Sequence, residues 1–210
     1  MTWHRIVFVS FFFLFFIYLF FFILTWLRLL FKNLFKFDFH FSFSTGINNV
    51  FRLQQNKLVY SLPLISKTWK LSFRIKPFRC VNGWGSILHG MVKPIRDESR
   101  YPGVWFWSQT TKLHICSYIN GHSYTCYNSK DQLPLDKFSE IAIQQLLVDN
   151  QYRYRITING VMVYDVVNTQ PASFTNVEYY AGNPWYTPAN AVIGNLKIND
   201  KFIVWNVVRM

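Results

Sequence analysis

Acidic residues are scarce in this chain of 210 residues, which has 10 Asp and Glu against 22 Lys and Arg. The glutamates stand at positions 98, 140 and 178, and no Glu-x-Asp-x-Glu strand holds a carboxylate pair together. Most glycoside hydrolases need two carboxylates that flank the scissile bond, and a calcium ion needs about six to eight oxygen ligands. The few scattered acids therefore argue against a glycosidase site and against a calcium site.

Other signatures of catalysis are also missing. There is no Gly-x-Ser-x-Gly nucleophile elbow, and the spacing suggests no Cys–His pair. The five histidines show no metal-ligand spacing, and His89 is interpreted as a strand histidine whose hydrogen bonds are satisfied. The sequence therefore predicts no enzyme, no catalytic residue, no cofactor and no metal site.

Charge is missing from one long stretch near the amino terminus, Ile6 to Leu27, which Arg5 and Arg28 bound. Its 22 residues would span about 33 Å as a helix, enough for a hydrocarbon core of about 30 Å. A cleaved signal peptide has a shorter apolar core that small residues soon follow, whereas this chain has no alanine before position 142. The run therefore predicts an uncleaved, single-pass membrane anchor, with secretion after signal cleavage as the alternative.

Two features of the sequence predict opposite orientations for this anchor. Arg28, Lys32 and Lys36 come after the apolar run, and the positive-inside rule would place the carboxy-terminal domain in the cytoplasm. The character of that domain favours the opposite side. We therefore expect a domain outside the cytosol, luminal or extracellular.

Phenylalanine is concentrated before residue 44, where 15 of the 22 lie. In the segment 35–44 five of them alternate with polar residues, so all the rings share one face of an extended chain. This pattern predicts a first strand that covers the domain or rests on the membrane surface. The alternative is a self-pairing segment that oligomerises the protein, because such alternation associates readily when it is exposed.

After residue 44 no stretch has a convincing helical period, and segments of period two recur instead. In the segment 67–76 one face collects Trp69, Leu71, Phe73 and Ile75, as expected for an antiparallel strand with one packed side. Asn120-Gly121, Asn159-Gly160 and Asp149-Asn150 lie between such runs and predict tight turns. Further strands are predicted over 47–53, 57–61, 84–91, 103–109, 112–119, 122–128, 138–148, 151–158, 161–167, 174–180, 191–198 and 202–207. The pattern indicates an all-β, two-sheet antiparallel jelly roll.

Several short motifs succeed one another along this domain: Gly83-Trp84-Gly85, Pro102-Gly103-Val104-Trp105-Phe106, Lys112-Leu-His-Ile-Cys116, Leu133-Pro-Leu-Asp-Lys137, Tyr154-Arg-Ile-Thr-Ile-Asn-Gly160, Asn183-Pro-Trp185 and Ile193-Gly-Asn-Leu196. In that order they resemble the concanavalin A-like, laminin G-like domains of extracellular animal proteins, and most of all an uncharacterised subgroup common in cnidarians. The resemblance covers residues 47–200 and implies a non-catalytic binding role without a known ligand. Trp84-Gly85 is followed by Ser86 rather than by the galectin pattern, so a galactoside site is not implied.

Cysteine is rare, with residues at positions 80, 116 and 126. Cys116 and Cys126 flank the Asn120-Gly121 turn. A two-residue loop would point the two thiols to opposite faces, whereas a three-residue loop would place them face to face and permit a cross-strand disulfide. We hypothesise this bridge, which leaves Cys80 buried or free to pair with another chain.

Two sets of residues are candidates for ligand contact. Lys70, Arg74 and Lys76 share the polar face of one strand, either as a site for sulfated glycans or anionic lipid headgroups or as an ordinary solvated face. Trp185 and Tyr186 lie in a proline-flanked loop, where a ring stacks on a sugar or packs against the sandwich edge. Trp105 and Trp107 share one strand face and are assigned to the core, as most strand tryptophans are.

These features together predict a tail and anchor over 1–30, a Phe-rich strand or linker over 31–46 and a lectin-like domain over 47–210. The expected function is non-catalytic recognition of carbohydrate or protein outside the cytosol. The alternative is a structural module that self-associates through its sheet edges and the Phe-rich segment. Membrane, glycan and a second copy of the chain are the expected partners, and nucleic acid is not, because no recognition motif is present.

Overall fold

The computed structural model describes residues 44–92 and 100–200 of the chain. The predicted membrane span over 6–27, nearly all of the Phe-rich segment and the predicted strand over 202–207 lie outside these residues. Within the described ranges there is no helix with the length and apolar character needed to cross a bilayer.

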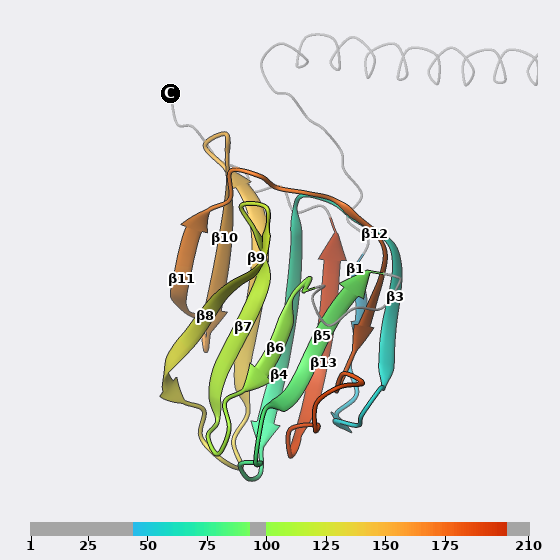
Figure 1. Ribbon diagram of the computed structural model, residues 1–210, viewed down its shortest axis with the longest axis vertical. Helices are drawn as coiled ribbons and strands as arrows, with labels where there is room; N and C mark the ends of the chain where they lie inside the picture. Colours follow the sequence, from blue (N-terminus) through green and yellow to red (C-terminus); the bar gives the residue numbers. More distant parts are fainter. Residues whose placement is uncertain (1–43, 93–99, 201–210) are drawn as a thin grey trace, which may run out of the picture. The chain divides into compact units, whose positions relative to one another are not determined.

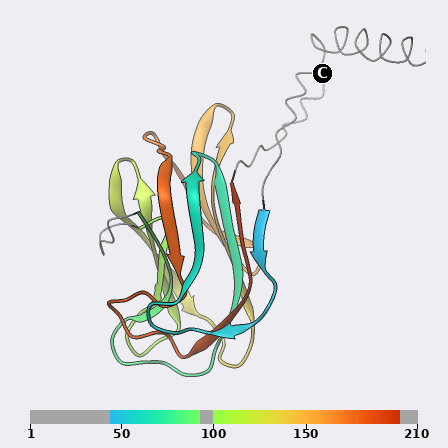
Figure 2. The ribbon, with the colours of Figure 1, turned by 90° about the vertical axis from the view of Figure 1, so that its right-hand side faces the viewer.

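The described chain folds into two antiparallel sheets. The strands are β1 (Ser44–Ile47), β2 (Phe51–Arg52), β3 (Leu58–Ile65), β4 (Trp69–Pro77), β5 (Gly85–Val92), β6 (Gly103–Phe106), β7 (Lys112–Ile119), β8 (His122–Gln132), β9 (Ser139–Val148), β10 (Gln151–Ile158), β11 (Val161–Val167), β12 (Phe174–Tyr180) and β13 (Ala191–Asp200). The seven-stranded sheet has the order β1-β13-β4-β9-β10-β11, with β2 also paired to β13. The six-stranded sheet has the order β3-β12-β5-β6-β7-β8. Figure 1 looks onto the six-stranded sheet with the other sheet behind it, and Figure 2 shows the two as separate layers.

The core lies between the two sheets and results from the alternation along their strands. On β4 the side chains of Trp69, Leu71, Phe73 and Ile75 are buried, while the side chains between them are half-buried on the outer face. The predicted packed face of this strand is therefore confirmed. Isoleucines on β9, β10 and β13 and the inner residues of β5, β6 and β7 complete the core, and each fully buried aliphatic side chain contributes about 1.5–3 kcal/mol.

The three predicted tight turns are confirmed by their backbone angles. Asn120-Gly121 has φ values of 54° and 81°, Asn159-Gly160 has 49° and 81°, and Asp149-Asn150 has 48° and 59°. Positive φ at both central residues is the requirement of the hairpin turn that matches the twist of its strands. Asparagine, aspartate and glycine are the residues that adopt this conformation at least cost.

Two predicted strand boundaries were wrong because loops interrupt them. The predicted strand over 47–53 is divided into β1 and β2, and β1 begins at Ser44, inside the predicted linker, where it pairs with β13. The predicted strand over 103–109 ends at Phe106, because the carbonyl oxygen of Trp107 accepts a hydrogen bond from the N–H of Thr110 at 3.1 Å in a turn.

Another strand is longer than predicted. β3 continues past residue 61 to Ile65 and includes Pro63. Because β3 is the edge of its sheet in the described part, the missing N–H of a proline is tolerated there.

A hydrogen bond between two buried side chains joins the two sheets through the core. The hydroxyls of Ser117 on β7 and Tyr154 on β10 lie 2.5 Å apart, and both side chains are buried. Burial raises the pKa of Tyr154, although the hydrogen bond with Ser117 opposes this shift. The phenol therefore stays neutral, and each hydroxyl satisfies the other.

Tyr154→Phe should lower the free energy of unfolding by about 1–3 kcal/mol, because it leaves the buried Ser117 hydroxyl without a partner. Urea unfolding measures the change, with Tyr164→Phe, a half-buried tyrosine of β11, as the control. The double variant Ser117→Ala/Tyr154→Phe should recover part of the loss. A Tyr154→Phe variant as stable as the wild type would contradict this role.

Candidate functional site

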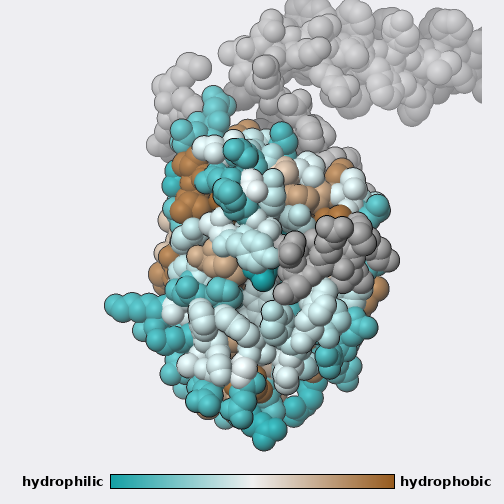
Figure 3. Space-filling view, viewed as in Figure 1, coloured by the Kyte–Doolittle hydropathy of each residue, from teal (hydrophilic) through white to brown (hydrophobic). Residues whose placement is uncertain are grey.

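The outer face of the six-stranded sheet carries the side chains that its strands do not direct into the core. On β6, Val104 and Phe106 pack in the core, so Trp105 between them points outward. On β7, Leu113 and Ile115 pack inward, so His114 points outward. Figure 3 shows this face, whose visible part is largely of intermediate hydropathy with strongly hydrophilic residues around its lower rim.

Aromatic rings gather on this outer face in two groups. The first group comprises Trp84, before β5, together with Trp107 and His114. The centroid of the Trp84 ring lies 4.2 Å from that of Trp107 and 4.8 Å from that of His114. The side-chain oxygen of Asn128 accepts hydrogen bonds from Trp107 Nε1 at 3.1 Å and from His114 Nδ1 at 2.6 Å. This amide therefore fixes the orientation of both rings, while Trp107 remains 37% exposed.

The second group lies in the loop between β12 and β13. Trp185 is 41% exposed, and its ring centroid lies 5.7 Å from that of the buried His89. The ring of Tyr186 lies 6.3 Å from that of Trp105. The ring centroid of Trp105 in turn lies 5.9 Å from that of His114, so the two groups are continuous. The six rings form what we term the aromatic platform: Trp84, Trp105, Trp107, His114, Trp185 and Tyr186.

A buried asparagine holds the second group in place. The backbone N–H of Asn183 donates to Ser86 Oγ at 2.9 Å, and its side-chain amide donates to His89 Nδ1 at 3.1 Å. Its side-chain oxygen accepts from the backbone N–H of Tyr186 at 2.9 Å. His89 is therefore a strand histidine with a hydrogen-bonded ring, as predicted, and the loop is fixed to β5.

Trp105 forms the buried floor between the two groups. Its ring covers Gly103 so closely that a Cβ on that residue would collide with it. Its indole N–H is buried and has no hydrogen-bond partner among the residues that the structure describes. The guanidinium of Arg100 lies 5.2 Å from the ring centroid of Trp105 and 4.3 Å from that of Tyr124. The platform is thus flanked by a cation, and its floor contains a buried indole N–H that has no partner within the described residues.

The basic residues predicted as ligand contacts lie on the other sheet. Lys70 and Arg74 line a hollow of about 380 Å³ on the outer face of the seven-stranded sheet, together with Glu140 and Lys197. The guanidinium of Arg74 lies 4.4 Å from the ring centroid of Phe138. Lys76, which does not line the hollow, has its Nζ 5.3 Å from the same ring. The structure therefore does not bring these cations together with Trp185 and Tyr186.

Cys116 and Cys126 form a disulfide in the structure. The turn has two residues, because Ile119 pairs with His122, yet Cys116 lies opposite Cys126. A register shift between Ser117 and Ile119 reconciles the two observations, since it adds one residue to β8. The third cysteine, Cys80, is free and exposed.

Sequence reasoning missed most of the platform. It noted that Trp105 and Trp107 share a strand face but assigned that face to the core, as most strand tryptophans are, whereas the structure directs Val104 and Phe106 inward and leaves Trp107 37% exposed. It also found no Cys–His pair, although His114 and Cys116 stand at positions i and i+2 of one strand. That alternation, with Cys126 on the next strand, was the available signal.

The electrostatics of the platform favour a neutral histidine. Burial and the nearby Arg100 cation lower the pKa of His114 below its ordinary value of 6.5, although the hydrogen bond with Asn128 opposes them. The side-chain oxygen of Asn128 only accepts, so Nδ1 carries the proton of the neutral ring.

No protein-family model matches this chain, and no curated protein matches its sequence. Among solved structures the fold is similar to a native heptameric SAP-like pentraxin from Limulus polyphemus, with a TM-score of 0.50 and 15% identity over 73% of this chain and 77% of that chain. Domain 4 of an extracellular GH43 arabinanase from Geobacillus stearothermophilus, in complex with arabinotriose, has a TM-score of 0.45 and 17% identity over 79% of this chain and 84% of that chain. A sialidase from Trypanosoma rangeli has a TM-score of 0.47 and 12% identity over 62% of this chain but 20% of its own length. At these identities the similarity establishes a jelly-roll, concanavalin-like sandwich and nothing further.

Asn183→Ala should release the loop that carries Trp185 and Tyr186. The variant removes the amide partner of His89 and the acceptor for the N–H of Tyr186, at a cost of about 1–3 kcal/mol. Hydrogen exchange should show faster exchange at the Tyr186 amide. The exposed Thr187→Ala in the same loop is the control, and equal protection in both variants would contradict the anchoring role.

The pH dependence of stability should report the burial of His114. As the pH falls through 6.5 the unfolded chain takes up the proton before the folded chain does, so the free energy of unfolding decreases until the lower folded pKa is reached. Urea unfolding at about pH 7.5 and about pH 5 should show a smaller decrease in His114→Gln than in the wild type. Equal decreases would contradict a lowered pKa.

Proposed function

We propose that the described domain is a non-catalytic, lectin-like module that binds carbohydrate through the aromatic platform. The module is laminin G-like, and the sequence motifs shared with the uncharacterised cnidarian subgroup support this narrower assignment. The observation that carries the proposal is the exposure of Trp107 and Trp185, at 37% and 41%, on one continuous group of rings.

Ring exposure favours sugar binding for a physical reason. A tryptophan face stacks on the apolar face of a pyranose. Stacking removes apolar surface of the exposed ring from water, and this burial contributes favourable binding free energy. Asn128 and Asn183 already hold the two exposed groups in place. Little conformational freedom is then lost on binding.

Polar groups at the platform supply the hydrogen bonds that a saccharide needs. The indole N–H of Trp105 is buried beneath the platform and lacks a partner within residues 44–92 and 100–200, so it bonds to a sugar hydroxyl only if the side chains above it move aside. The guanidinium of Arg100, next to the same ring, adds a cation that suits an acidic sugar.

The absence of catalysis is part of the proposal. Glu178 lies on β12 between the inward-facing Val177 and Tyr179, and it is buried with its carboxylate hydrogen-bonded by Tyr180 at 2.8 Å. A single buried carboxylate does not supply the pair that glycoside hydrolysis requires. We therefore expect bound oligosaccharides to be recovered intact.

The proposal also includes the membrane anchor over 6–27 and a domain outside the cytosol. The uncharged run of 22 residues supports the anchor, and the disulfide between Cys116 and Cys126 supports an oxidising compartment. Protease protection of the full chain in sealed microsomes tests the location: protection of the domain supports a luminal location, and digestion contradicts it.

Assembly through sheet edges is the second candidate function. Within the described ranges β11 is the outermost strand of its sheet, and Val161 and Met162 on it are 64% and 55% exposed. An exposed apolar edge strand can pair with another copy of the chain. Self-association in analytical ultracentrifugation, together with no glycan binding, would favour this function over recognition.

Trp107→Ala and Trp185→Ala should each weaken glycan binding by roughly tenfold, equivalent to about 1.4 kcal/mol for one lost stacking contact. A glycan array with the full chain selects the saccharide, and calorimetry then measures its affinity. Phe138→Ala is the matched control, because Phe138 is 38% exposed and directly precedes β9 of the opposite sheet, next to Arg74.

Three results would contradict the proposal. If no glycan on the array binds, carbohydrate is not the ligand. If both tryptophan variants keep the affinity of the wild type, the aromatic platform is not the binding site. If only Phe138→Ala loses binding, the ligand binds in the basic hollow around Arg74 and not on the aromatic platform.

A further inference from the structure

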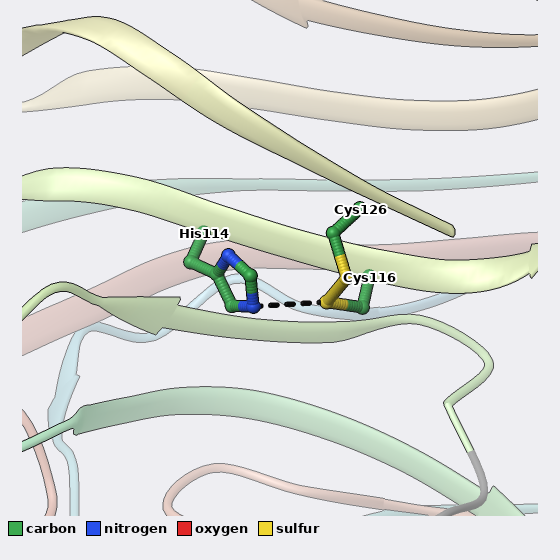
Figure 4. Close-up of side chains that lie close together, drawn as sticks. All are labelled: His114, Cys116 and Cys126. Carbon is green, nitrogen blue, oxygen red and sulfur yellow. Dashed lines mark hydrogen bonds between the residues drawn. A yellow bond between two sulfur atoms is a disulfide. The ribbon is translucent and has the colours of Figure 1, made fainter. Parts of the chain in front are cut away.

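Three potential metal ligands converge beside the first ring group of the platform. His114 and Cys116 stand two residues apart on β7 and project from the same face, and Cys126 lies opposite Cys116 on β8. The ligand atoms of the three side chains all lie within 4.8 Å of one another. Figure 4 shows the imidazole of His114 directed at the disulfide, with Nε2 3.0 Å from the sulfur of Cys116.

The protonation of His114 leaves this nitrogen ready to bind a cation. The side-chain oxygen of Asn128 accepts a hydrogen bond from Nδ1 at 2.6 Å, so Nε2 of the neutral ring carries a lone pair. A disulfide sulfur has no proton to donate to it. An acceptor that binds the remote N–H is also the arrangement that orients metal-bound histidines.

We propose that the disulfide masks a Cys₂His site for a thiophilic divalent cation such as Zn²⁺, and that reduction by a dithiol opens it. The dithiol transfers two electrons and two protons to the Cys116–Cys126 bond and becomes a disulfide itself. The cation then binds both sulfurs as thiolates, releases their two protons to solvent, and binds Nε2 of His114. Water completes a tetrahedral set, since three protein ligands with an open fourth position form a recognised zinc geometry.

The geometry requires side-chain rotation and no rearrangement of the backbone. Zinc binds sulfur at about 2.3 Å and nitrogen at about 2.0–2.1 Å, so tetrahedral ligand atoms lie about 3.5 Å apart. The two sulfurs separate once their bond is reduced, while strand pairing on both sides keeps Cys116 opposite Cys126. His114 and Cys126 are half-buried and Cys116 is buried, so a cation and its water reach the site from the side of His114 and Cys126.

This site goes beyond the proposed function and rests on different atoms. Sugar stacking uses the faces of exposed tryptophans in the oxidised chain, whereas cation binding uses Nε2 and two reduced sulfurs. Failure of one therefore leaves the other standing.

Cobalt titration of the purified full chain in detergent tests the site. A phosphine reductant opens the disulfide without adding a competing thiol. The reduced chain should bind one equivalent of Co²⁺ with visible d–d absorption of a tetrahedral ion and a near-ultraviolet thiolate charge-transfer band, and Zn²⁺ should displace it. The oxidised chain should show neither signal.

Variants assign the ligands. Cys126→Ser should abolish the charge-transfer signal expected for two thiolates, and His114→Ala should weaken binding at least tenfold. Cys80→Ser and His122→Ala, which change an exposed cysteine and an exposed histidine, are the matched controls and should bind as the wild type does.

Four results would overturn the proposal. These are no cobalt absorption in the reduced chain, equal binding in the oxidised chain, unaltered binding in His114→Ala, and loss of the β-sheet circular dichroism on reduction. The last result counts against it because the site requires β7 and β8 to remain paired.

Discussion

The alternation of side chains along a β-strand is the constraint on which the whole structure depends. Two sheets pack face to face, so every second residue of β6 and β7 is committed to a dry core. The residues between them must lie on the outer face, whatever their chemistry. The outward positions of Trp105 and His114 are thus a consequence of burying Val104, Phe106, Leu113 and Ile115, and the rigid core below holds these two rings in place.

The register of the β7–β8 hairpin determines what this outer face can do. A two-residue turn followed by one extra residue in β8 places Cys116 opposite Cys126 and His114 opposite Asn128. The first pairing permits the disulfide, and the second fixes the ring of His114. One local irregularity therefore sets both the covalent link between the strands and the direction of the histidine lone pair.

Much of the fold could be predicted from the sequence, because its signals are local. Alternation on β4 identified its buried face, and Asn-Gly pairs located the turns. The platform could not be predicted in the same way, because it depends on which of two apolar faces of β6 turns inward and on how a distant loop folds back onto β5. Trp185 was proposed from its loop alone. The roles of Trp84 and Trp107 depend on how three segments pack together, which the sequence does not display. The bulge beside Ser117 has no sequence marker that we recognise.

The most direct measurement of the central claim is the response of the tryptophan indole N–H resonances to a saccharide ligand. If the outer face of the six-stranded sheet binds sugar, titration should shift the indole signals of Trp107 and Trp185 and leave that of the buried Trp69 in place. Shifts confined to backbone signals around Lys70 and Arg74 on the opposite sheet, with the platform indoles unmoved, would contradict the account.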